Sequence, residues 1–134
     1  MTYEELIAAK KAIKNRKINK DEEHRIQCAC VRWFSLQYPR LRGRLFAVPN
    51  GGRRDAVTGA KLKAEGVVAG VADLILLKSN RDYGALLIEM KTRKGRQRDS
   101  QKEWQNTVCA DGEYKYVVCR SFDDFKREVS EYLK

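Results

Sequence analysis

The stretch from Val71 to Thr92, VADLILLKSNRDYGALLIEMKT, constrains the fold of this chain most strongly. Two apolar runs flank the polar segment SNRDY, and a connection this short between two strands makes an antiparallel hairpin. We expect the strands to cover Asp73 to Lys78 and Gly84 to Lys91. Both faces of each run are apolar, which indicates a hairpin in the centre of a sheet with helices on both sides.

Three charged side chains interrupt these runs at the end away from the turn. A turn centred on Arg81 places Asp73 directly across from Glu89, and Lys91 follows on the same face because side chains alternate along a strand. Directly opposed Cβ atoms lie about 5 Å apart, so the two carboxylates would repel each other. Buried charges need a partner or a cation.

The spacing of this triad leaves two interpretations open. One is an ordinary salt-bridge cluster at the end of a sheet. The other is a site for Mg²⁺ or Mn²⁺, which bind through one or two carboxylates, water and substrate phosphate. A neighbouring lysine can then activate the attacking water or offset charge on phosphorus, which predicts metal-assisted hydrolysis of phosphodiester bonds. A register slip of one residue would put Asp73 and Glu89 on opposite faces.

The charge balance favours a polyanionic partner. The chain of 134 residues contains 28 Lys and Arg against 18 Asp and Glu, a net charge of +10, and nucleic acid is the first candidate. A merely basic surface is the alternative. No apolar run approaches the roughly 20 residues of a membrane span and no signal peptide is visible, so we expect a cytoplasmic protein.

Histidine and cysteine usage argues against other kinds of site. His24 is the only histidine, which disfavours nucleases that depend on paired histidines. The four cysteines form no C-x-x-C pair, so buried free thiols are expected in place of a zinc site. These cysteines are Cys28, Cys30, Cys109 and Cys119.

The remaining pattern predicts one α/β domain with a small central sheet flanked by helices. Thr2 and Glu5 form a capping box for a short first helix, which a basic linker through Lys20 would follow. The other expected elements are a helix over Asp21 to Tyr38 capped by Asn19 or Asp21 and stopped by Pro39, a strand over Arg44 to Val48, a helix over Asp55 to Glu65 closed by Gly66, a helix capped near Asp99 or Ser100, a strand over 114–120, and a helix from Ser121 with Asp124 in its capping box.

Asp73 followed by Glu89, Met90 and Lys91 resembles the D...(D/E)xK motif of the PD-(D/E)xK nuclease superfamily. The segments VPNGGRRD, GAKLKAEGVVAGVADLILL, LLIEMKTRKGRQRDSQKEWQ and VVCRSFDDFKREVSEYL are similar to a VRR-NUC domain, over about 22–133. The resemblance implies a restriction-endonuclease-like core. It further implies a single nuclease domain over 1–134, with an N-terminal helical extension in 1–20 and the VRR-NUC-like core in 21–134. Ala72 stands where the superfamily name has proline, a residue that shapes backbone only.

The resemblance assigns chemistry to four neighbouring residues. Asp73 and Glu89 match the metal-binding carboxylates, and Lys91 matches the catalytic lysine. The backbone carbonyl of Met90 matches a further metal ligand. The implied cofactor is Mg²⁺ or Mn²⁺.

Two residues from other helices complete the implied catalytic set. Glu23 matches the acidic residue of the leading helix and would reach the metal through water, and Gln101 matches a glutamine on the helix after the E-x-K strand. From the sequence alone, Glu23 can equally be a favourable first-turn charge, with Glu22 as its rival. Gln101 can equally be an exposed helix residue.

A glycine turn and two basic clusters are predicted to contact DNA phosphates, which positions DNA without specifying bases. The alternatives are an ordinary turn and solvated charge runs. The residues are Asn50, Gly51, Gly52, Arg53, Arg54, Lys61, Lys63, Arg93, Lys94, Arg96 and Arg98.

The small stand-alone members that the chain resembles, from phages and bacteria, imply a homodimer that cuts branched DNA such as Holliday junctions, in a bacterial or phage-infected host cytoplasm. A flap- or end-directed nuclease of the same mechanism, and a non-catalytic nucleic-acid-binding module that retains the fold, are the rival predictions.

Overall fold

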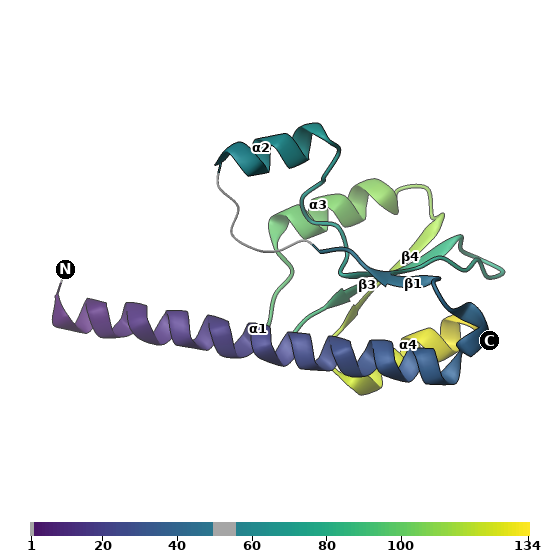
Figure 1. Ribbon diagram of the computed structural model, residues 1–134, viewed down its shortest axis with the longest axis horizontal. Helices are drawn as coiled ribbons and strands as arrows, with labels where there is room; N and C mark the ends of the chain where they lie inside the picture. Colours follow the sequence, from purple (N-terminus) through teal and green to yellow (C-terminus); the bar gives the residue numbers. More distant parts are fainter. Residues whose placement is uncertain (1, 50–55) are drawn as a thin grey trace.

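The computed structural model describes residues 2–49 and 56–134, without the side chains of Arg16 and Asn19. A four-stranded sheet with the order β1-β2-β3-β4 lies at its centre, with α1 and α4 on one side and α3 on the other (Figure 1). The first three strands are antiparallel, and β4 runs parallel to β3. This confirms the predicted α/β class. The strands are β1 (Leu45–Ala47), β2 (Leu74–Leu76), β3 (Ala85–Met90) and β4 (Tyr114–Cys119).

Helix α1 (Tyr3–Gln37) corrects the predicted break near Lys20, because it continues through the basic segment without interruption. No Gly or Pro interrupts this segment, and its alanines, lysines and arginine are strong helix formers, so the charge run does not end the helix. The caps proposed at Asn19 and Asp21 are therefore wrong. The capping box of Thr2 and Glu5 is confirmed, while the division into an extension (1–20) and a core (21–134) stays a prediction.

The other helices lie close to their predicted places, but the cap predicted at Asp99 or Ser100 is wrong: the N-cap of that helix is Arg98, whose N–H donates to the Gln101 side chain. A short 3₁₀ helix, η1 (Pro39–Leu41), follows α1. Gly66 ends the α2 region with a φ of 104°. The Ser121 side chain caps α4 by accepting a hydrogen bond from the Asp124 N–H, but the predicted capping box is incomplete because Asp124 Oδ2 accepts from the Arg120 N–H instead of the Ser121 N–H. The predicted start at Asp55 lies outside the described residues. The bounds are α2 (Ala56–Ala64), α3 (Asp99–Val108) and α4 (Phe122–Tyr132).

The core lies between the sheet and the pair α1 and α4. Burying each large apolar side chain there contributes about 1.5–3 kcal/mol to stability. All four cysteines are free, and Cys30 and Cys119 are buried as expected, whereas Cys28 is exposed on α1. The main core residues are Cys30, Phe34, Leu74, Leu76, Leu86, Ile88, Met90, Cys119, Phe125, Val129 and Tyr132.

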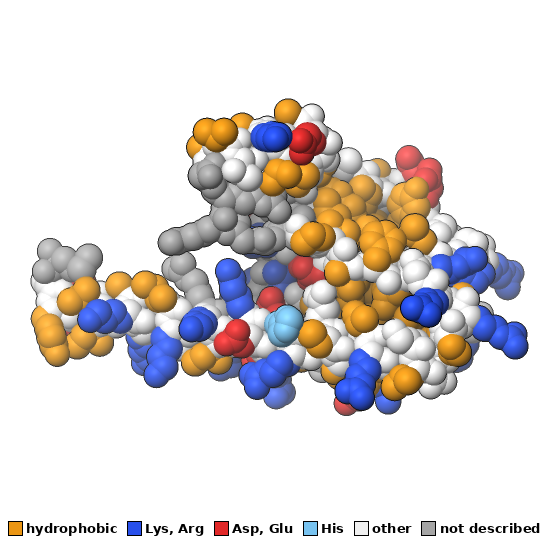
Figure 2. Space-filling model, in the orientation of Figure 1, with side chains coloured by type: hydrophobic (Ala, Val, Ile, Leu, Met, Phe, Trp, Pro, Cys, Tyr) orange, Lys and Arg blue, Asp and Glu red, His pale blue; other side chains and the backbone are white. Residues whose placement is uncertain are grey.

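The opposite face of the sheet is covered unevenly. Under α3, Leu87 of β3 is 5% exposed, but Phe46 of β1 and Leu77 beyond β2 are 38% and 53% exposed. The expectation that helices cover both faces therefore holds for β3 and is wrong for the β1–β2 side. Figure 2 shows hydrophobic side chains gathered over this part of the sheet.

Candidate active site

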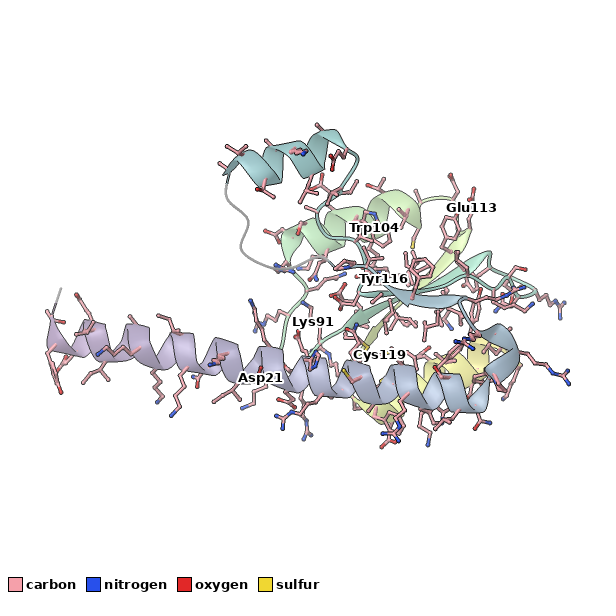
Figure 3. All side chains as sticks on the ribbon, viewed as in Figure 1. Asp21, Lys91, Trp104, Glu113, Tyr116 and Cys119 are labelled. Atoms are coloured by element: carbon pink, nitrogen blue, oxygen red, sulfur yellow. The ribbon has the colours of Figure 1, made fainter. Side chains whose placement is uncertain are left out.

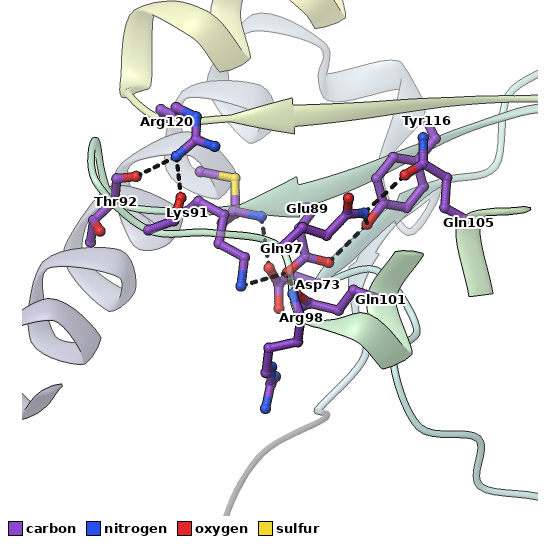
Figure 4. Close-up of polar contacts among 12 residues, drawn as sticks. Asp73, Glu89, Lys91, Thr92, Gln97, Arg98, Gln101, Gln105, Tyr116 and Arg120 are labelled. Atoms are coloured by element: carbon purple, nitrogen blue, oxygen red, sulfur yellow. Dashed lines mark hydrogen bonds and ion pairs between the residues drawn. The ribbon is translucent and has the colours of Figure 1, made fainter. Parts of the chain in front are cut away.

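The β2–β3 hairpin brings the predicted triad together at its open end. Ile75 pairs with Leu87, and the same register continued by two residues sets Asp73 against Glu89, as the turn length predicted. Asp73 Oδ2 accepts a hydrogen bond of 2.7 Å from the Met90 N–H. Because Asp73 lies just before β2 and Met90 ends β3, this bond ties the two strand ends together (Figure 4).

The Glu89 carboxylate is buried, with 1% of the residue exposed, and three groups hold it. Gln101 Nε2 donates to Oε1 over 2.6 Å, and the Tyr116 hydroxyl donates to Oε2 over 3.2 Å. The ammonium of Lys91, also buried, lies 3.8 Å from Oε1. Glu89 is therefore fixed in position from three sides.

Lys91 offsets only part of the unfavourable environment of the carboxylates Glu89 and Glu23. Burial, followed by the negative charge of Asp73 and a hydrogen bond to it, raises the pKa of Glu89 to about 8, although Lys91 opposes the shift. Burial also raises the pKa of Glu23, again against Lys91. A divalent cation would favour the ionised form of every carboxylate here.

Gln101 is a buried part of the site, which excludes the interpretation of an exposed helix residue. It lies in the first turn of α3, where its Oε1 accepts from the N–H of the N-cap residue Arg98 over 2.7 Å. Its Nε2 is then left to face Glu89. The helix start thereby fixes both the place and the orientation of the amide.

Glu23 reaches the same region from α1. It is half-buried, and its electrostatic neighbours are Lys91, Asp73 and Arg98, whereas Glu22 is exposed. The structure thus favours Glu23 over its rival. Glu23 also lines a pocket of about 520 Å³, seen in Figure 2 as the hollow above α1. The other lining residues are Lys20, His24, Gln27, Cys28, Val31, Arg32, Asp73 and Met90.

A hydrogen-bonded group next to Glu89 was not predicted from the sequence. Besides donating to Glu89, the Tyr116 hydroxyl accepts from Gln97 Nε2, which also donates to Gln105 Oε1. The Tyr116 ring also lies 6.3 Å, centroid to centroid, from that of Trp104 (Figure 3). Alternation along β4 puts Tyr116 on the face of Glu89, but only the parallel β3–β4 register reveals that the two meet.

Gly70 is a second missed contributor. A Cβ atom there would lie 2.1 Å from the carbonyl oxygen of Ser100, and the φ of Gly70 is +83°. Glycine therefore lets the loop before Asp73 contact the first turn of α3 directly. This contact brings the helix that carries Gln101 close to the hairpin.

Hydrogen bonds from Arg120 fix the backbone of the basic loop between β3 and α3. Arg120 Nη1 donates to the carbonyl oxygens of Thr92 and Gly95 (Figure 4). The predicted DNA contacts of this loop, Arg93, Lys94, Arg96 and Arg98, are exposed, as are Lys61 and Lys63 in the last turn of α2. The predicted contacts from Asn50 to Arg54 lie outside the described residues.

The ligand types fit a hard divalent cation. In the described part of the chain, no three side chains of His, Cys, Asp or Glu are placed to hold a metal. Asp73 and Glu89 form a two-carboxylate set, which suits Mg²⁺ and Mn²⁺ because these ions retain water and bind substrate phosphate. The closeness of the two carboxylates supports this fit, because the negative charge of Asp73 helps to raise the pKa of Glu89 and a cation between them would relieve that repulsion.

Comparison with known proteins identifies the family. The model of the VRR-NUC domain matches residues 11–123. The chain belongs to the VRR-NUC domain family. A solved structure described as a "VRR_NUC domain protein" superposes on it with a TM-score of 0.70 at 26% identity, covering 83% of this chain and 87% of that one. No curated protein matches the sequence. The fold prediction is thereby confirmed, and membership of the VRR-NUC family implies nuclease activity on DNA.

Proposed function

We propose that this VRR-NUC chain is a metal-dependent DNA endonuclease that hydrolyses phosphodiester bonds in branched DNA such as Holliday junctions. The observation that carries the proposal is the pairing of Asp73 and Glu89 beside the buried Lys91. Asp73, Glu89 and the carbonyl of Met90 would hold Mg²⁺ or Mn²⁺, with Glu23 acting through water. Such an ion supplies Lewis acidity and lowers the pKa of bound water.

The side chains of the chain itself have separate tasks in this proposal. The Lys91 ammonium orients the attacking water or stabilises the charge that develops on the phosphate oxygens. Gln101 and Tyr116 act as positioning residues, because each donates a hydrogen bond that fixes one oxygen of Glu89. Their hydrogen bonds hold the Glu89 carboxylate in place beside Asp73.

The basic residues around the pocket are the proposed contacts to DNA phosphates. Among those on the β3–α3 loop, Arg98 lies beside Asp73 and Glu89 (Figure 4). Contacts of this kind weaken with salt and do not read bases. The proposed set is Asn50, Gly51, Gly52, Arg53, Arg54, Lys61, Lys63, Arg93, Lys94, Arg96 and Arg98.

A homodimer would supply the two sites that symmetric cutting of a four-way junction needs. The open β1–β2 side supports such a contact, because its apolar side chains Phe46 and Leu77 are 38% and 53% exposed. Within the described residues, no helix is both long and apolar enough to cross a bilayer. We place the protein in the cytoplasm of a bacterium or of a phage-infected host.

An assay with labelled substrates tests the proposal. Four-way junctions, flaps and plain duplex are incubated with the protein and Mg²⁺, Mn²⁺ or EDTA. We expect metal-dependent cutting, fastest on the junction, and a dimeric mass in solution. Preference for flaps or ends would favour the rival nuclease, and binding without metal-dependent cutting of any substrate would favour the non-catalytic module. A clear monomer would contradict the paired-cut model.

Two neighbouring glutamates provide a matched test of the site geometry. Glu23→Gln is expected to lower metal-dependent cleavage by about 10–100-fold, the usual effect of losing a group that supports a metal ligand. Glu22→Gln makes the same chemical change one residue away, on an exposed side chain, and should leave the rate within about twofold. Initial rates across a metal titration measure both. The reverse pattern would show that Glu22 faces the metal.

A further inference from the structure

The N-terminal part of α1 carries a run of positive charge that none of the roles above uses. We call residues 3–20 the basic arm. Between residues 10 and 20 its sequence, KKAIKNRKINK, contains six basic residues and no acidic one. Every described side chain from Thr2 to Lys20 is exposed, so no part of the protein core explains this segment.

The basic arm begins at the candidate active site and leads away from it. Lys20 and Glu23 line the pocket that contains Asp73, and the same helix then extends beyond the sheet toward the N-terminus (Figure 1). With a rise of 1.5 Å per residue, Lys10 lies about 15 Å along the axis from Lys20. That length corresponds to roughly four to five base pairs of duplex at 3.4 Å each.

Three lysines of the basic arm have no acidic partner in direct contact among the described residues. In the part of the chain that is described, Lys10, Lys14 and Lys17 form no ion pair. They follow one another at i, i+4 and i+7, a spacing at which like charges destabilise a helix. A polyanion laid along this side would convert that repulsion into attraction.

The distribution of apolar residues selects DNA over other partners. Leu6 and Ile13 lie on one flank of the lysine row at 100° per residue, and Ile7 and Ile18 lie on the other. Lysines therefore run between these apolar side chains, and Figure 2 shows blue and orange side chains alternating along the visible face of the arm. A membrane-bound helix needs an apolar face free of charge, and a second copy would set lysine against lysine.

We infer that the basic arm binds the phosphate backbone of the DNA that flanks the cleavage site, as a docking surface beyond the predicted contacts. The inference rests on the proposed nuclease function, because it assigns part of that enzyme's DNA footprint. The arm adds affinity and positions the substrate, while the chemistry stays with the carboxylates and Lys91. Four lysines in contact with phosphates would contribute up to about 3.6 to the slope of log affinity against log salt.

The test compares two variants of the full chain with equal net charge. Lys10, Lys11, Lys14 and Lys17 are changed to Gln in the arm variant, and Arg40, Arg42, Arg44 and Arg81, exposed residues beyond the other end of α1, are changed to Gln in the control. DNA affinity is measured in EDTA by fluorescence anisotropy from 50 to 300 mM salt. The arm variant should bind at least about tenfold more weakly, with the magnitude of its salt slope lower by roughly 2–3.6, and the control should follow the wild type.

Further measurements distinguish a failure of the inference about the basic arm from a failure of the proposed nuclease function. Changing the same four lysines to Arg should retain affinity, because a phosphate contact requires the charge. Equal behaviour of the arm and control variants, with wild-type binding and cutting intact, would overturn the inference and leave the nuclease proposal standing. Loss of binding to anionic lipid vesicles, or a change in oligomeric mass, without loss of DNA affinity would also overturn it. A wild-type protein that neither binds nor cuts DNA would sink the proposed function itself.

Discussion

Lys91→Ala is expected to abolish DNA cleavage while DNA binding is largely preserved. The ammonium of Lys91 is buried and lies 3.8 Å from Glu89 Oε1, so alanine removes the positive charge from this position. Removing one group that stabilises developing charge in a water-poor site costs about 10²–10³ in rate. Binding depends on exposed basic residues elsewhere and should change by less than about threefold. Single-turnover cleavage and anisotropy binding in EDTA measure the two quantities separately.

Lys102→Ala is the matched control for this prediction. It removes the same charge from an exposed position on α3, one residue after Gln101, and should leave the cleavage rate near wild type. Because Lys91 also offsets the charge of Glu89, thermal unfolding must show that the Lys91 variant is folded at the assay temperature. Robust turnover by a folded Lys91→Ala protein would remove this residue from the mechanism.

The hairpin could be predicted from the sequence because it is local. A five-residue turn between two apolar runs leaves few registers, and alternation then places Asp73, Glu89 and Lys91 on one face. The strands are shorter than expected, and β2 ends at Leu76. The register survives this error, because it depends on the turn and not on the strand ends.

The interactions behind Glu89 could not be predicted, because they join segments far apart in the chain. Tyr116 meets Glu89 only through the parallel pairing of β3 and β4, which a crossover through α3 sets up. The arrangement of Gln97 and Gln105 depends on the same packing.

The continuity of α1 was not predicted for a different reason. Hydrophobic periodicity identifies helices that pack against a core, and the charged segment of α1 lacks an apolar stripe of that kind.

The stability of the metal-free protein is expected to fall as the pH rises from about 4.5 to about 8. Burial and Asp73 raise the pKa of Glu89 to about 8 in the folded state, while the unfolded chain has the ordinary value near 4.5. The folded state therefore holds a proton across this range that the unfolded state has already lost, and stability declines until both have lost it. The loss by pH 7 is of the order of 3 kcal/mol. Chemical denaturation in EDTA at several pH values measures it.

Glu89→Gln should remove most of this pH dependence and separate stability from activity. The neutral amide keeps the shape of the side chain but cannot ionise, so the metal-free variant is expected to exceed the wild type in stability at pH 8. Mg²⁺ or Mn²⁺ should stabilise the wild type at pH 8, where the ion favours ionised Glu89, and should stabilise the variant far less. The variant should also lose cleavage. Equal metal-induced shifts in melting temperature for the two proteins would place the cation away from Glu89.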